Sequence, residues 1–84
     1  MIISTIDVGT NSVKLLVANA VRNELRPIEE RVVVTRLGEG VSRTGRIGRA
    51  PAERTFLRLL EFRKRIRSYP VTATALAGTR VFRA

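Results

Sequence analysis

The stretch IDVGTNSVKLL, Ile6–Leu16, decides the fold because a run of small polar residues joins two apolar segments within it. Ile2–Asp7 is rich in β-branched residues, and Ser12–Ala20 carries apolar residues on alternate positions, so both segments predict strands. The polar run between them is too long for a two-residue hairpin loop and contains one glycine. It predicts either a plain turn or a loop that wraps around an anion.

The residue types in this run suit anion binding. Asp7, at the end of the first strand, can order a hydrated Mg²⁺, which prefers oxygen ligands and keeps several waters. Gly9 allows close backbone approach, and the residues up to Ser12 offer successive N–H and hydroxyl donors. Lys14 shares a strand face with Ser12 and can add a positive charge. Taken alone, the pattern also fits an ordinary turn.

Composition limits the chemistry that the chain can perform. Its 84 residues carry 16 Lys and Arg against 7 Asp and Glu, a net charge of +9, and most of the cations are arginine. A small basic domain of this kind suits phosphate-bearing partners. A general compositional preference for arginine would produce the same excess of positive charge without any such partner. Cysteine and histidine are absent, which excludes disulfides, thiolate sites and imidazole catalysis. The sequence predicts a cytoplasmic protein.

No targeting or membrane segment is expected. The start, MIISTIDVG, lacks the basic residues that begin a signal peptide and contains an aspartate too early. No apolar run approaches the roughly 20 residues of a transmembrane helix.

Further along the chain the pattern is that of an α/β protein. Leu25–Arg36 predicts a third strand in meander order, antiparallel to the second, with Pro27 indicating an edge position or a bulge. Leu37–Arg49 has four glycines and predicts a loop, and Ala50–Ser68 predicts a helix. Val71–Ala77 predicts a fourth strand, parallel to a neighbour because a helix connects them.

The predicted helix has an apolar stripe and a charged side. The stripe consists of Ala52, Phe56, Leu59, Phe62, Ile66 and Tyr69. The opposite side consists of Arg54, Arg58, Glu61 and Arg65. Arg63 falls within the stripe, so either its stem packs while its head reaches solvent, or it points toward a bound anion. One helix covers one sheet face, and Val81 and Phe82 begin a further helical face, which predicts a fragment of a longer chain.

Four stretches resemble, in order and spacing, the exopolyphosphatase and guanosine pentaphosphate phosphohydrolase family. They are IDVGTNSVKLLVA, VTRLGEGVSRTGRIG, AERTFLRLLEFRKRIRSYPV and ALAGTRVFRA. Together they cover essentially the whole chain. The family belongs to the actin-like ATPase superfamily, whose core is ribonuclease H-like.

The resemblance implies a fold and an activity. Residues 1–84 would be a partial N-terminal actin-like ATPase domain, a three-stranded antiparallel meander with a crossover helix and a fourth, parallel strand. In the whole protein two such domains would face each other across a cleft, where water removes the terminal phosphate of polyphosphate or guanosine pentaphosphate with help from Mg²⁺. The implied partners are polyphosphate or guanosine penta- or tetraphosphate and the remainder of the chain. A homodimer is left open.

The resemblance also implies site residues. The first phosphate loop would consist of Asp7, Gly9, Thr10, Asn11, Ser12 and Lys14, with Asp7 acting on the metal directly or through water. A second loop would consist of Gly38, Glu39 and Gly40, and the fourth stretch would add Thr79 and Arg83. Thr10 and Lys14 replace the usual serine and arginine, and Arg80 stands where a small residue is usual. The catalytic glutamate and the second glycine-rich loop have no match, so the fragment alone should be inactive.

Two other functions fit the residues. A small basic module could hold nucleic acid through the arginine-rich helix face, but the chain has few aromatic residues for base stacking, so nucleic acid is not the expected partner. A regulatory relative could sense guanosine tetraphosphate without hydrolysing it.

Overall fold

The computed structural model describes residues 1–78 of the chain. Its elements are β1 Ile2–Val8, β2 Ser12–Val21, β3 Glu24–Val34, α1 Val41–Thr44, α2 Arg49–Arg67 and β4 Val71–Gly78. The strands and the long helix confirm the predicted elements to within one or two residues at each end. Within this part of the chain, neither helix combines the length and the apolar character needed to cross a membrane.

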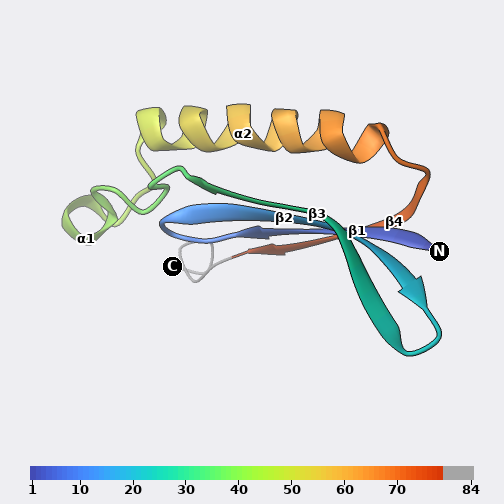
Figure 1. Cartoon of the computed structure of the whole chain (residues 1–84). Coiled ribbons are helices and arrows are strands. Elements are labelled where there is room, and N and C mark those ends of the chain that lie inside the picture. The colour runs from blue at the N-terminus through green and yellow to red at the C-terminus, as the bar shows by residue number, and fades with distance from the viewer. Residues whose placement is uncertain (79–84) are drawn as a thin grey trace.

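The strands form one mixed sheet in the order β3-β2-β1-β4. The pairs β1–β2 and β2–β3 are antiparallel, and β4 lies parallel to β1 on its other side. The helix α2 makes the crossover between β3 and β4 and lies along one face of the sheet (Figure 1). The α/β class, the meander and the parallel fourth strand are therefore confirmed.

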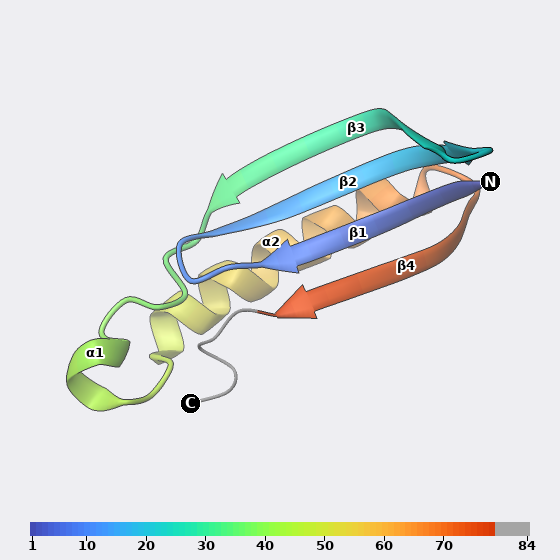
Figure 2. The same ribbon diagram turned by 90° about the horizontal axis from the view of Figure 1, so that it is seen from below.

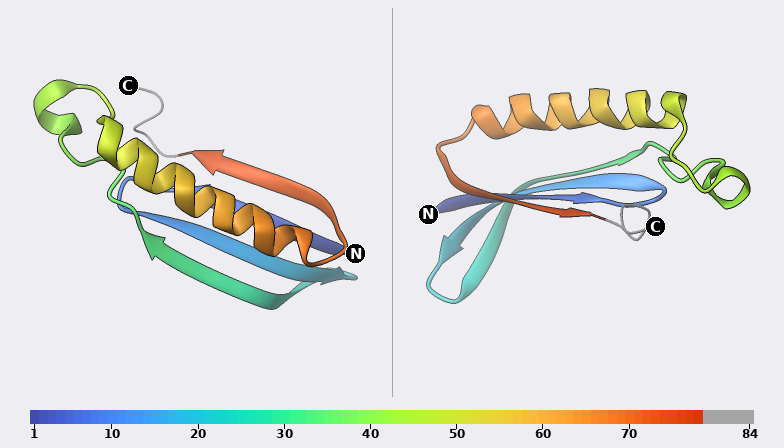
Figure 3. Two further views of the ribbon diagram at one scale, coloured as in Figure 1. Left: turned by 90° about the horizontal axis from the view of Figure 1, so that it is seen from above. Right: turned by 180° about the vertical axis from the view of Figure 1, so that it is seen from behind.

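The core lies between α2 and the sheet face that it covers (Figure 3). Its buried apolar residues are Ile6, Val8, Val13, Leu15, Val17, Leu37 and Phe62. They alternate along β1 and β2 because successive strand residues point to opposite faces. The side chains between them point to the other face, over which the described residues place no helix (Figure 1).

The buried face of α2 is rotated from the predicted stripe. Packing against the core is confirmed for Leu59, Phe62, Ile66 and Tyr69. It is wrong for Ala52 and for Phe56, whose side chain is 53% exposed, because Thr55 takes the buried position instead. The Thr55 hydroxyl donates to the Pro51 carbonyl oxygen at 2.9 Å, which allows this polar side chain to be buried.

The charged side of α2 differs accordingly. Arg58 and Glu61 form an ion pair with each other on the exposed side, as expected of outward-facing residues. Arg54 and Arg65 do not point away, since both guanidinium groups bond to β3 or to the segment that follows it. With the face rotated toward Thr55, these two arginines border the sheet.

The third strand and the loop after it show two departures. The strand β3 ends at Val34 and not at Arg36, but it is an edge strand with a register shift beside Pro27, as predicted. The predicted loop Leu37–Arg49 contains the short helix α1, and α2 begins at Arg49. The helix α1 has no buried residue and too few residues for a periodic pattern, so the sequence gives it no signal.

Candidate phosphate-binding loops

The first two predicted phosphate loops lie at the same end of the sheet. The loop between β1 and β2 is at the carboxyl end of β1, and the segment after β3 returns to that end (Figure 2). The strand β4 also ends there, because Val8 and Gly78 are paired in the parallel ladder. This is the end of an open sheet where α/β proteins commonly bind ligands.

Backbone hydrogen bonds join the two loops. The amides of Thr35 and Arg36 both donate to the Asn11 carbonyl oxygen at 3.0 Å, and the Gly38 amide donates to the Thr10 carbonyl oxygen at 2.8 Å. Within the first loop, the Gly9 amide donates to the Ser12 carbonyl oxygen at 2.8 Å. Because these carbonyl oxygens are directed at N–H groups, they do not face an incoming anion.

Two glycines allow this close approach. A Cβ atom at Gly9 would lie 2.9 Å from the Ser12 carbonyl oxygen, inside normal contact distance. A Cβ atom at Gly38 would lie 3.3 Å from Cβ of Thr10 in the other loop. Gly9, the glycine predicted to allow close backbone approach, therefore stands where the backbone does come close, and the structure adds a second close approach at Gly38.

Asp7 and Lys14 are cross-strand neighbours on the sheet face that α2 leaves open. They are paired in the β1–β2 register, and both side chains are exposed. With Thr5 and Glu30 they line a hollow of about 370 Å³ beside the first loop. The predicted placement of Lys14 on one strand face with Ser12 follows from the confirmed strand β2.

The structure does not bring every predicted residue to this end. Gly38, Glu39 and Gly40 lie in the segment that contacts the first loop or directly after it. Arg63 is exposed near the carboxyl end of α2, which lies at the opposite end of the sheet (Figure 2). Thr79 and Arg83 lie outside the described residues, as does the helical segment expected to follow β4.

Two further residues, which the sequence did not indicate, belong to this region: Arg54 contacts the second loop, and Glu30, within β3, lines the hollow with Asp7 and Lys14. The Nε atom of Arg54 donates to the Thr35 carbonyl oxygen at 3.1 Å, and its Nη2 atom lies 3.4 Å from Glu39 Oε2. For Arg54 the sequence shows only that it shares one side of the helix with Arg65, which follows eleven residues, or about three turns, later. Glu30 gave no signal, because its neighbours depend on the pairing of β3 with β2.

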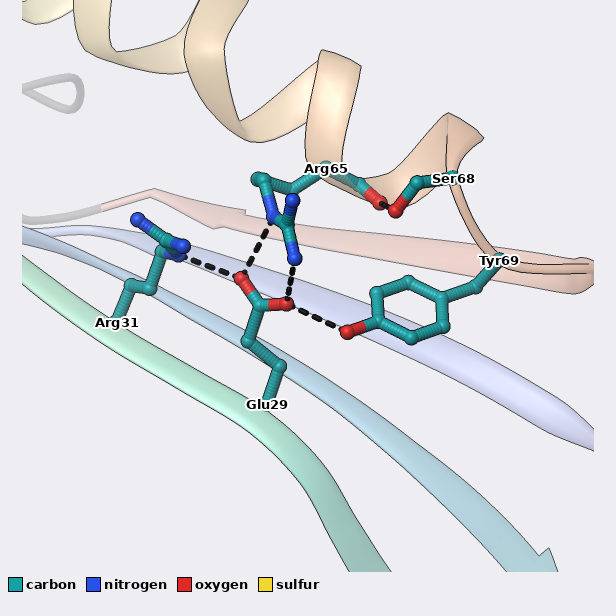
Figure 4. Close-up of polar contacts among 5 residues, drawn as sticks. All are labelled: Glu29, Arg31, Arg65, Ser68 and Tyr69. Atoms are coloured by element: carbon teal, nitrogen blue, oxygen red, sulfur yellow. Dashed lines mark hydrogen bonds and ion pairs between the residues drawn. The ribbon is translucent and has the colours of Figure 1, made fainter.

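At the other end of α2 a polar cluster fixes the helix to β3 (Figure 4). Arg65 holds the Glu29 carboxylate with two hydrogen bonds, at 3.0 and 2.6 Å, and the Tyr69 hydroxyl donates to it at 2.6 Å. Arg31 adds a further donor. These hydrogen bonds, from Arg65 first, lower the pKa of Glu29 far below its ordinary value. The bond to Glu29 also raises the pKa of Tyr69.

Comparison with known proteins identifies relatives of this chain. No protein-family model matches the chain. A curated relative, Exopolyphosphatase 2 of Mycobacterium tuberculosis (strain CDC 1551 / Oshkosh), is 36% identical over 64 residues, which cover 71% of this chain and 20% of the relative.

Solved structures match over nearly the whole chain. The crystal structure of the type II variant of the Aquifex aeolicus Ppx/GppA phosphatase gives a TM-score of 0.92 at 34% identity, covering 99% of this chain and 28% of that one. An exopolyphosphatase from Cytophaga hutchinsonii gives 0.91 at 26% identity, covering 99% and 27%. The chain thus spans between 20% and 28% of the length of these proteins.

These matches agree with the resemblance found from the sequence and with the fold, a four-stranded mixed sheet with a crossover helix as in actin-like ATPases. The chain therefore matches the Ppx/GppA phosphatases in both sequence and structure, and it corresponds to about a quarter of the length of those solved structures.

Proposed function

We propose that the chain is one part of a phosphohydrolase that removes the terminal phosphate of inorganic polyphosphate or guanosine pentaphosphate. The observation that carries the proposal is the joining of the two loops through the Gly38 amide and the Thr10 carbonyl oxygen, 2.8 Å apart. The relatives are described as exopolyphosphatases and Ppx/GppA phosphatases, which supports this class of substrate. We also place the protein in the cytoplasm, because these 84 residues contain no cysteine.

In this proposal the first loop holds the terminal phosphate. The Thr10 and Ser12 hydroxyl groups donate to phosphate oxygens, and the Lys14 ammonium group adds a point charge beside them. Hydrolysis forms a bond from a water oxygen to the terminal phosphorus, while the bond to the leaving phosphate breaks and the water gives up its proton. The general base for that proton lies outside this chain in our proposal.

The residues fit a magnesium ion through one carboxylate. Asp7 is exposed at the end of β1, and among residues 1–78 no three acidic side chains converge. Mg²⁺ retains several waters and binds readily through one or two carboxylates and substrate phosphates, so Asp7 alone is sufficient from this chain. The ion would neutralise phosphate charge.

The test compares two isosteric variants of the full-length protein, D7N and E24Q. Glu24 is an exposed acid that pairs with Arg26 beside the β2–β3 turn, at the far end of the sheet (Figure 2). Phosphate release from polyphosphate or guanosine pentaphosphate, in the presence of Mg²⁺, should fall by about 10²-fold or more in D7N and stay unchanged in E24Q.

Three results would contradict the proposal. Equal phosphate release by D7N and the wild type would show that Asp7 has no role in the site. Binding of single-stranded RNA that D7N leaves intact, without phosphate release by the wild type, indicates a nucleic-acid module. Binding of guanosine tetraphosphate by a wild type that hydrolyses neither substrate indicates a sensor.

A further inference from the structure

Arg54 connects the long helix to the second phosphate loop. It lies in the second turn of α2 with its side chain 43% exposed. Its Nε–H group donates to the Thr35 carbonyl oxygen at 3.1 Å, and Nη2 lies 3.4 Å from Glu39 Oε2. These two acceptors stand on either side of the residues 36–38, so one guanidinium group bridges both ends of that short segment.

The bridged segment is the one that contacts the first loop. Thr35 and Arg36 donate to the Asn11 carbonyl oxygen from their amides, and Gly38 donates to Thr10. Arg36 has a φ angle of +52°, a left-handed conformation that is unfavourable for a residue with a side chain. Such a conformation persists only where the surrounding contacts hold it, so the segment depends on its bonds to Asn11 and to Arg54.

The helix α2, which carries Arg54, is itself anchored to the sheet. Phe62 is 1% exposed in the core, and Arg65 grips Glu29 on β3 with two hydrogen bonds (Figure 4). Arg54 stands about three turns before Arg65 and so projects from the same side of α2. The helix is thereby tied to β3 near its carboxyl end and to the segment after β3 near its amino end.

We infer that Arg54 is a positioning residue, which holds the second phosphate loop against the first in the geometry that binds phosphate. The inference rests on the proposed function of these loops. Arg54 acts through the Thr35 carbonyl and the Glu39 carboxylate and does not itself touch substrate. Its guanidinium group is suited to this role because it donates in two directions from one plane, whereas a lysine nitrogen reaches such a pair of acceptors less well.

The experiment uses the full-length protein with tripolyphosphate as the probe. R54Q is compared with R58Q, a matched change of an arginine on the same helix whose partner, Glu61, is also on that helix. We expect KM for tripolyphosphate to rise about 10-fold in R54Q, with a smaller change in kcat, and no change in R58Q. R54K should fall between R54Q and the wild type. Equal KM values for R54Q and R58Q would overturn the inference.

Amide hydrogen exchange gives a second measurement that needs no activity. In R54Q the amides of Thr35, Arg36 and Gly38 should exchange faster than in R58Q, while the β1–β2 ladder stays protected. A wild type without phosphate release refutes the proposed function, yet exchange still decides whether Arg54 holds the loop. Unchanged exchange in R54Q refutes the positioning role, as does faster exchange with an unchanged KM.

Discussion

Gly9 and Gly45 both lie in turns, but a side chain would meet different surroundings at the two positions. At Gly9 an added Cβ would lie 2.9 Å from the backbone oxygen of Ser12, a contact that forces the first loop to shift. At Gly45 nothing lies within 4 Å among the described residues, and the strain comes from its φ angle of +70° alone. A side chain at position 9 would therefore displace the candidate site, whereas a side chain at position 45 would not.

This difference predicts separate outcomes for two alanine variants of the full-length protein. G9A should weaken tripolyphosphate binding about 10-fold or more, because the loop that carries the donors is displaced. G45A should lose about 1 kcal/mol of stability through its left-handed backbone and bind as the wild type does. Calorimetric titration measures both affinities. The role given to the first loop is wrong if both variants bind tripolyphosphate equally well.

Single residues differ in how far the sequence predicts their place. The shared face of Ser12 and Lys14 follows from strand alternation, and the close backbone approach at Gly9 follows from the absence of a side chain there. Arg54 could not be placed in the same way, because a helical pattern shows which residues share a side but not where the sheet lies. Because Thr55 is buried and Phe56 is not, the buried face of α2 differs from the predicted stripe, and Arg54 lies at the sheet.

At the scale of elements, the buried side chain of Phe62 packs α2 against the sheet, and a charged cluster joins α2 to the strand β3. The two ends of the pair Glu29–Arg65 are 36 residues apart, so their meeting depends on the register of β3 as well as on the helix. The element order was predictable from hydrophobic periodicity and from proline and glycine positions. The contact between Glu29 and Arg65 could not be predicted, because these patterns do not show which charged residues of a helix and a strand face each other.

The Glu29 cluster predicts a pH dependence of stability. The folded-state pKa of Glu29 lies below its ordinary value of about 4.5, so its contribution is present above that pH and is lost as the pH falls toward the folded-state pKa. Thermal unfolding of the 84-residue chain, followed by circular dichroism, should show a midpoint that drops between about pH 5 and pH 3.

Two glutamine variants identify the source of that drop. In E29Q the midpoint should be lower at pH 7 and should vary less over the acid range, because the titrating partner of Arg65 is gone. In E61Q, which removes an exposed acid paired with Arg58 on α2, the acid drop should remain as in the wild type. An unchanged acid drop in E29Q would mean that other carboxylates dominate it.

At the scale of the molecule, the two faces of the sheet differ in what covers them. The helix α2 covers one face, whereas the other carries exposed apolar side chains on the edge strand β3, among them Val32 at 64% and Val34 at 59% exposure. An edge strand also presents backbone groups that can pair with another chain. A large exposed apolar area next to a free edge favours association in water.

We therefore expect the 84-residue chain, studied by itself, to self-associate at micromolar concentration. V32K, which places a charge on the open face of β3, should shift the chain toward monomer in sedimentation velocity. L57K adds the same charge at a residue of α2 that is 58% exposed and should leave association unchanged. Because both variants raise the net charge of +9 equally, a difference between them isolates the sheet face from general charge repulsion. A wild-type chain that stays monomeric, or equal behaviour of V32K and L57K, would show that this face does not drive association.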